Sequence, residues 1–228
     1  MKKIKMLILG LLLAAQTGVV SAQNTIINGH KFIDLALPSG VLWAESNIGA
    51  DSEADPGDYY GWGETLPKNA YSWAGYSYGM DEDHITKYNQ RDNKLGLDVA
   101  DDAAYANWSC CRIPTNNEFA ELRDTTNCKW TWTERYTPTG DVVDGYLVTS
   151  KVNGNSIFLP AGGCRDGEGT DYYGARGFYW TSTLSSLYSN YAYFQCIESE
   201  GPYSSYDHRY YGLSIRPVTD AMTGLATR

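Results

Sequence analysis

The side chains best suited to chemistry in this 228-residue chain are its tyrosines, because of their number and their grouping. Ten of the 19 tyrosines lie in the range 172–211, where they are mixed with serine, asparagine, aspartate and histidine. Tyrosine offers a large rigid contact surface with a polar tip, and serine and asparagine supply adaptable hydrogen bonds. This mixture predicts a surface that binds a protein or a glycan.

Two short runs, 188–191 and 203–211, carry this composition most densely. The residues that we expect to contact the ligand are Tyr188, Asn190, Tyr191, Tyr203, Ser204, Ser205, Tyr206, Asp207, His208, Tyr210 and Tyr211. Arg209 either joins them or is buried against carboxylates. The alternative is that aromatic residues simply pack in cross-strand pairs, which explains Tyr179 and Tyr193 better than the non-alternating run 203–211.

Evidence for catalysis is weaker. The pairs Asp55/Asp58 and Glu198/Glu200 could serve as acid and base on a carbohydrate or protein substrate, but sequence proximity does not set their separation in space. The chain has no phosphate-binding loop, nucleophile elbow or zinc-protease motif. We therefore expect no catalytic residue, no metal and no cofactor. The alternatives are a secreted enzyme with paired carboxylates and a structural cell-surface subunit with an unpaired strand edge.

The net charge and the histidine and cysteine contents argue against several kinds of ligand and site. The formal net charge of -9 argues against a nucleic-acid partner, because phosphate backbones are bound by clustered Lys and Arg. Three histidines leave little material for a histidine-based metal site or catalytic triad. The five cysteines match no zinc spacing and are odd in number, so we expect buried thiols and leave their pairing open.

Residues 1–22 have the pattern of a secretory signal peptide. Lys2, Lys3 and Lys5 precede a short apolar run, and small residues at 20–22 mark a cleavage site. The apolar run is too short to span a membrane. The mature protein is therefore expected to be secreted or at the cell surface, and loss of the three lysines changes its formal charge from -9 to -12.

The remaining chain predicts one α+β domain over residues 23–218 and a tail over 219–228. Helical spacing covers 97–108, and Thr115 to Glu118 form a capping box that begins a second helix. Gly- and Asp-rich residues 51–63 predict a loop. Strands are expected at 32–37, 41–43, 146–152, 156–159, 178–183, 191–197 and 213–218. The expected core residues are Trp43, Trp62, Phe119, Leu122, Ile157, Leu159, Trp180 and Ile215.

Several segments, in order along the chain, carry a family resemblance. They are DLALPSGVLWA from Asp34, GDYYGWGET from Gly57, RIPT from Arg112, GNSIFLPAGG from Gly154, YWTS from Tyr179 and SIRPV from Ser214. The chain resembles the Fibrobacter succinogenes major paralogous domain, which is abundant in secreted Bacteroidetes proteins. The resemblance implies a C-type-lectin-like fold of the formylglycine-generating-enzyme type, with a twisted antiparallel sheet, two helices and long loops.

Proteins of this fold are also the variable proteins of diversity-generating retroelements. There, adenine mutagenesis turns asparagine codons into codons for Tyr, Ser, Asp, His or Arg, and every residue in 203–211 and 188–193 belongs to the accessible set. Glu198 and Glu200 do not. The calcium-dependent sugar-binding motifs of lectins are absent, and Cys164 and Cys196 stand in contexts unlike the reactive pair of the formylglycine-generating enzyme. The resemblance therefore implies a non-catalytic binding or adhesion module.

Overall fold

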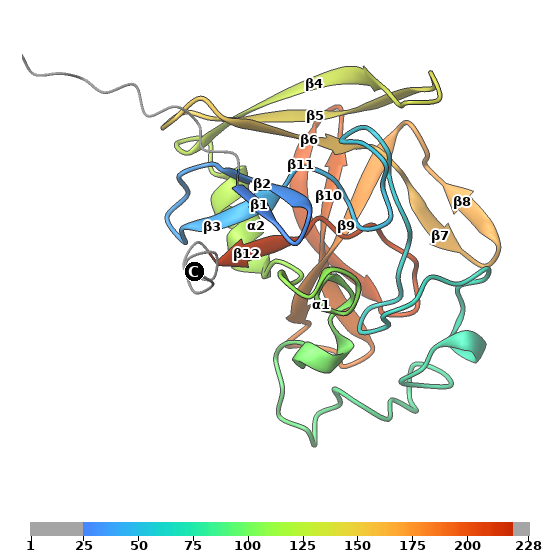
Figure 1. Cartoon of the computed structure of the whole chain (residues 1–228). Coiled ribbons are helices and arrows are strands. Elements are labelled where there is room, and N and C mark those ends of the chain that lie inside the picture. Colours follow the sequence, from blue (N-terminus) through green and yellow to red (C-terminus); the bar gives the residue numbers. More distant parts are fainter. Residues whose placement is uncertain (1–24, 221–228) are drawn as a thin grey trace, which may run out of the picture.

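The structure is a computed structural model that describes residues 25–220 (Figure 1). The predicted signal peptide over residues 1–22 lies outside the described residues, as do residues 221–228 of the predicted tail. Antiparallel strands and two short α-helices make up the fold, which confirms the α+β class. Within the described residues, none of the helices combines the length and the apolar character of a membrane span.

The first sheet joins the two ends of the described chain. It contains β1 (Thr25–Ile27), β2 (His30–Asp34), β3 (Val41–Ala44) and β12 (Val218–Asp220), in that order. The strands predicted at 32–37 and 41–43 do pair as a hairpin, but the first of them ends at Asp34. The Gly40 amide closes the turn by donating to the Leu37 carbonyl at 2.9 Å. Thr219 and Asp220 pair with β3, so the prediction of a tail beginning at residue 219 is wrong for these two residues.

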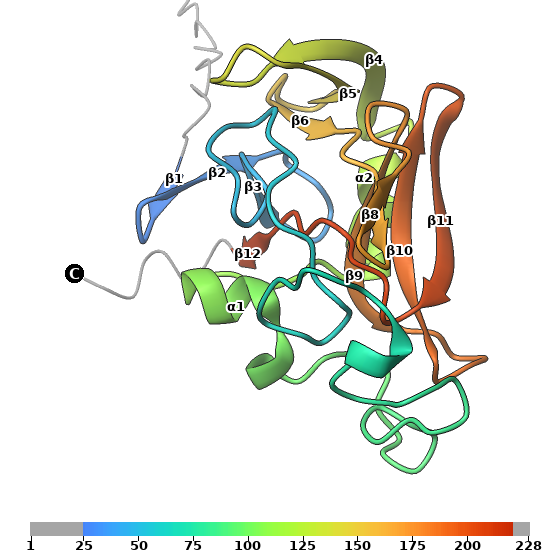
Figure 2. The same cartoon turned by 90° about the vertical axis from the view of Figure 1, so that its right-hand side faces the viewer.

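Two three-stranded antiparallel sheets and a small hairpin complete the β structure. One sheet contains β4 (Cys128–Tyr136), β5 (Val142–Ser150) and β6 (Ser156–Pro160). The other contains β9 (Arg176–Leu184), β10 (Tyr191–Glu198) and β11 (Gly201–His208), with β11 at its outer edge (Figure 2). The hairpin consists of β7 (Cys164–Asp166) and β8 (Gly169–Asp171). The strands predicted around 146–159, 178–183 and 191–197 are confirmed.

The strand predicted at 213–218 is wrong. Leu213 and Ser214 make only isolated bridges, to Tyr60 and Tyr179, before β12 begins at Val218. Pro217 interrupts the run, because it has no amide hydrogen to donate to a strand ladder. Its neighbour Arg216 is fully buried and donates to the carbonyls of Ala44, Glu45 and Phe158.

One of the two predicted helices is confirmed, and the other is divided in two. The Thr115 and Glu118 capping box begins α2 (Asn116–Arg123) as predicted. The single helix predicted over 97–108 is split into a 3₁₀ turn, η2 (Val99–Asp101), and α1 (Ala103–Trp108). The split occurs at Asp102, whose carboxylate caps α1 by accepting from the amides of Ala104 and Tyr105. A second 3₁₀ turn, η1 (Trp73–Gly75), lies in the long loop before it.

All eight predicted core residues are at most 2% exposed. Trp62, Trp180 and Ile215 belong to one buried cluster, and the other five, Trp43 and Phe119 among them, belong to a second. Burial of each such side chain contributes about 1.5–3 kcal/mol. The helix α2 contacts β4 and all three strands of the β9–β11 sheet, so it fixes that sheet from one face.

Candidate functional site

The Tyr-rich run 203–211 forms most of the edge strand β11 and the turn that follows it. Its register with β10 pairs Tyr203 with Cys196 and Tyr206 with Tyr193. Successive side chains of a strand point to opposite faces of the sheet. The run therefore presents two different surfaces, one carried by Tyr203, Ser205 and Asp207 and one carried by Ser204, Tyr206 and His208.

The first surface lines a groove with a volume of 450 Å³. From the Tyr-rich region the groove receives Tyr203, Ser205, Asp207 and Tyr211. The β7–β8 hairpin and the residues after it contribute Cys164, Asp166, Asp171, Tyr172 and Arg176, and its apolar part is formed by Phe178, Phe194 and Leu213. We refer to these twelve residues as the groove. Four of the eleven predicted binding residues thus line one concave site.

The hairpin is held against the groove by residues on its other face. Arg165 points away from Cys164 and Asp166 because of the strand alternation, and its guanidinium donates to the carbonyls of Glu168, Gly169 and Asn69. Its backbone also bridges Gly212, with hydrogen bonds of 2.8 and 3.0 Å. The hairpin is therefore fastened to the residue that directly follows Tyr211.

The second surface is an aromatic face made of Tyr188, Tyr191, Tyr193, Tyr206 and His208. The Tyr206 ring lies 5.7–6.4 Å from the rings of Tyr188, Tyr191 and Tyr193, and the Tyr191 and His208 rings stack at 4.5 Å. Tyr188 is 53% exposed and Tyr206 is 37% exposed. Rings that support one another and remain open to solvent form a pre-ordered contact surface.

The remaining predicted residues flank these two surfaces. Ser204 donates to Asn116 of α2 at 2.7 Å, so it ties the strand to the helix. The Asn190 carbonyl accepts from the Arg209 amide at 3.1 Å, at the start of β10. Tyr210 packs between His208, Tyr211 and Trp73, with centroid distances of 4.6–5.6 Å.

Arg209 is an anchor beneath the site. It is fully buried, and its guanidinium lies 5.2 Å from the Trp62 ring and 5.3 Å from the Tyr76 ring. It donates to the carbonyls of Lys87 and Tyr88 at 3.0 and 3.2 Å. The prediction that Arg209 meets carboxylates or joins the binding surface is therefore wrong. Two carbonyl oxygens and two aromatic faces take the place of a carboxylate partner, and the Arg209 Nε has no hydrogen-bond partner within the described residues.

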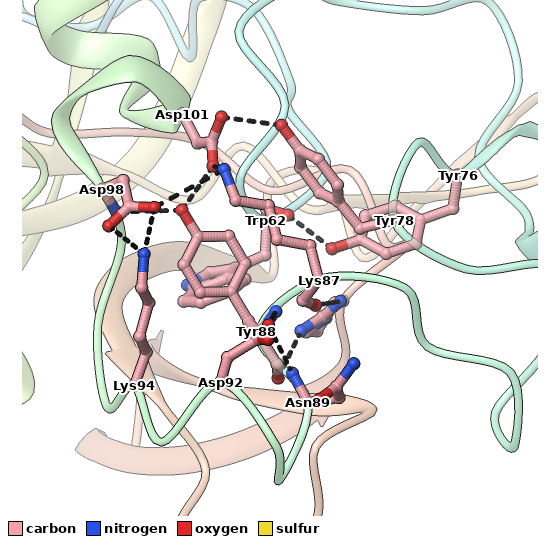
Figure 3. A network of polar contacts seen from close by, with 11 residues as sticks. Trp62, Tyr76, Tyr78, Lys87, Tyr88, Asn89, Asp92, Lys94, Asp98 and Asp101 are labelled. Carbon is pink, nitrogen blue, oxygen red and sulfur yellow. Dashed lines mark hydrogen bonds and ion pairs between the residues drawn. The ribbon is translucent and has the colours of Figure 1, made fainter.

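The loop that receives Arg209 is held by a polar network around Asp101 (Figure 3). The Asp101 carboxylate accepts from the hydroxyls of Tyr78 and Tyr88 and from the Lys87 ammonium. Burial alone would raise the pKa of Asp101, but these three donors outweigh it and hold the pKa below its ordinary value. This network fixes the loop carbonyls that hold the end of β11.

Two tyrosine hydroxyls of the groove, those of Tyr203 and Tyr211, have raised pKa values. Burial, together with the nearby Cys196 thiol and the Glu198 charge, raises the pKa of Tyr203 to about 12. Burial and the neighbouring Tyr210 also raise the pKa of Tyr211. At neutral pH both side chains are therefore uncharged groups that can donate as well as accept hydrogen bonds.

One carboxylate of each pair weighed as acid and base has another partner. The Asp55 carboxylate accepts from the amides of Asp51 and Gly57 and so shapes a turn, while burial raises the pKa of Asp58. Glu198 forms an ion pair with Arg176 at 2.7 Å. Among residues 25–220, no three His, Cys, Asp or Glu side chains converge as the ligands of a metal ion would.

Sequence reasoning missed the hairpin half of the groove. Asp166, Asp171 and Tyr172 were not predicted to belong to the site, although the Asp166-Gly167 dipeptide is a turn signal that could have located the β7–β8 hairpin. Phe178 and Phe194 were assigned only to strands. Only the structure shows that these strands and the hairpin face one another.

Part of the chain matches a known family. A family model described as a domain of unknown function (DUF8237) matches residues 141–218. The matched part runs from β5 to the start of β12 and contains the groove, the aromatic face and Arg209. No curated protein and no solved structure matches the chain.

Proposed function

We propose that the protein is an exported, non-catalytic binding or adhesion module that uses the β11 region to hold its ligand. The observation that carries this proposal is that one edge strand presents a tyrosine-lined groove on one face and a half-exposed aromatic face on the other. Tyrosines with serine neighbours give contact area at low entropic cost. The rigid support from Arg209 and α2 lowers that cost further.

We further propose that the fold is C-type-lectin-like, as the resemblance to the Fibrobacter succinogenes major paralogous domain implies. Support comes from the curled antiparallel sheets, the two short helices and the long loop over residues 45–98. Ligand recognition through aromatic stacking and hydrogen bonds suits this chain, since it lacks the calcium-binding sequence motifs of lectins.

Diversification of the site by a retroelement is part of the proposal. The residues accessible to adenine mutagenesis fall on adjacent strands, where Tyr191 and Tyr193 meet Tyr206. Ala192 and Arg209 also lie in these runs but are fully buried, so we expect them to be constant. The gene tests this: codons ending in C or T at the exposed positions and an adenine-bearing near-copy beside a reverse transcriptase would support it. Absence of both features would end it.

The binding function is tested on arrays of glycans and surface proteins. Once a ligand is found, the double substitution Tyr203→Ala and Tyr211→Ala should weaken its capture at least tenfold, because both rings line the groove. The matched control is Tyr136→Ala, which removes a tyrosine that is 66% exposed on β4, in a different sheet. Equal capture by both variants would reject the proposed site.

A further inference from the structure

The groove has an excess of negative charge from two facing elements. On the β7–β8 hairpin, Asp166 and Asp171 share the face that carries Cys164, because Cys164 and Asp171 are register partners. On β11, Asp207 shares the face of Tyr203 and Ser205. All three carboxylates line the groove.

The three carboxylates all raise the pKa of the same side chain, that of Cys164. The pKa of the Cys164 thiol is raised to about 12, first by burial and then by the charges of Asp171, Asp166 and Asp207. Cys164 packs against the core at the base of the hairpin. The negative potential of all three side chains therefore extends into the groove.

Two of these three charges lack compensation within the described part of the chain, while Asp207 accepts a hydrogen bond from the His208 amide at 2.8 Å. Neither Asp166 nor Asp171 has a side-chain hydrogen bond or an ion pair there, and both are exposed. Arg176 is the one basic side chain among the groove residues, and Glu198 at 2.7 Å already neutralises it. The Arg176 guanidinium also stacks over Tyr172, at 5.0 Å from the ring centroid.

The side chains that line the groove, together with the outer edge of β11, indicate which kind of cation the groove can bind. The apolar side chains of Phe178, Phe194 and Leu213 suit an aliphatic stem, and the tyrosine rings suit a cationic head. The carboxylates do not converge into a metal-ligand cluster within the described residues, so they match an extended organic cation better than a metal ion. Among the strands of residues 25–220, β11 has a neighbour on one side only, so its outer side can align an extended polypeptide.

We propose that the groove receives the side chain of a lysine or arginine presented by a partner polypeptide. This inference rests on the proposed function and specifies the class of its ligand. The net charge of -9 favours the approach of such a basic partner over the whole surface.

The test compares two capped tripeptides of nearly the same shape, acetyl-Gly-Arg-Gly-amide and acetyl-Gly-citrulline-Gly-amide, in which a neutral ureido group replaces the guanidinium. Binding to the purified protein is followed by the shifts of backbone amide resonances in an NMR titration. We expect the arginine peptide to shift the amides of Ser205 and Asp207 and to bind at least about tenfold more tightly than the citrulline peptide, because charge-assisted hydrogen bonds are lost with citrulline. Raising the salt concentration from about 0.02 M to about 0.5 M should weaken binding of the arginine peptide.

Substitutions in the β7–β8 hairpin test whether the arginine peptide binds in the groove. Asp166→Asn with Asp171→Asn should reduce affinity for the arginine peptide about tenfold, since charge-assisted hydrogen bonds become neutral ones. Both positions are exposed and without partners, so folding is preserved. The matched control Glu168→Gln removes one charge from the same hairpin at a residue that does not line the groove, and it should leave affinity unchanged.

Three results would overturn the inference. They are equal affinity for the two peptides, no binding of either up to about 10 mM, or equal losses in the Asn variants and the Glu168→Gln control. If a neutral glycan depends on Tyr203 and Tyr211 while the arginine peptide fails, the binding function survives and the basic-residue assignment is wrong. If no ligand depends on those tyrosines, the proposed function itself fails.

Discussion

Arg209 and Trp62 contact each other twice. The Trp62 amide donates to the Arg209 carbonyl at 2.8 Å, and the Arg209 guanidinium lies 5.2 Å from the centre of the Trp62 ring. A buried arginine thus fastens the end of the edge strand to the core. This anchor lies between the exposed Tyr203 and Tyr206 before it and the half-buried Tyr210 and Tyr211 after it, and it holds the chain at that point.

Replacing the anchor should destabilise the fold. Arg209→Met leaves the carbonyls of Lys87 and Tyr88 without their donors, and we expect the free energy of unfolding to fall by about 3 kcal/mol. Urea denaturation measures this. Arg91→Met, at an exposed position in the neighbouring loop, should change it by less than about 0.5 kcal/mol. Similar values for the two variants would contradict the anchoring role.

The Asp101 network should make stability depend on pH. Because its folded pKa lies below the ordinary value, Asp101 contributes stability above pH of about 4, and that contribution disappears as the pH falls through the folded pKa. Asp101→Asn should therefore lower the free energy of unfolding by about 2 kcal/mol at pH 7, with the difference from the native protein shrinking in acid. Asp83→Asn, at an exposed loop position, serves as control. A difference that does not change with pH would refute this account.

The thiols should react slowly in the folded protein. All five cysteines are free, and burial raises the pKa of Cys128 and of Cys196 to about 11 and that of Cys164 to about 12. Because the thiolate is the reactive form, alkylation of the folded protein at pH 8 should be slow. In urea, alkylation should reach all five cysteine thiols of each chain. Fewer than five thiols in urea would mean that a disulfide forms.

Gly212 should be needed to hold the hairpin beside the groove. A Cβ atom there would lie 2.7 Å from the Tyr71 ring and 2.9 Å from the Cβ of Arg165. Gly212→Ala should therefore cost about 2 kcal/mol in unfolding free energy and weaken ligand capture. Gly169→Ala meets no close neighbour in the same hairpin and is the control. Equal stability of the two variants would argue against this tight packing.

Much of the fold could be predicted from local signals. The Pro38-Ser39-Gly40 turn and the Thr115 capping box each depend on nearby residues, and each is present in the structure. The Asn153-Gly154 dipeptide also lies between two paired strands, but β5 ends at Ser150 and residues 151–155 form the connection, which is longer than a two-residue turn. The burial of Trp43, Trp62 and Trp180 could also be predicted, because tryptophan has a large apolar side chain. Local signals were misleading at Asp102, whose carboxylate caps α1 and splits the predicted helix, and over 213–217, where Pro217 interrupts the predicted strand.

The site was only half predictable for a related reason. The tyrosine composition of 203–211 marked the binding run, but not that the run is an edge strand with two unlike faces. Its opposite wall, with Asp166 and Asp171, comes from a hairpin whose position depends on contacts with Gly212 and Asn69. Such contacts between distant segments leave no trace in local spacing.

The most direct test of the central claim is hydrogen–deuterium exchange with and without a ligand found on the arrays. If the β11 region holds the ligand, protection should rise in the peptides covering 164–172, 188–193 and 201–211, while those from β4 and β5 stay unchanged. Protection confined to β4 and β5, or to the exposed loop 80–91, with no change over 201–211, would contradict it.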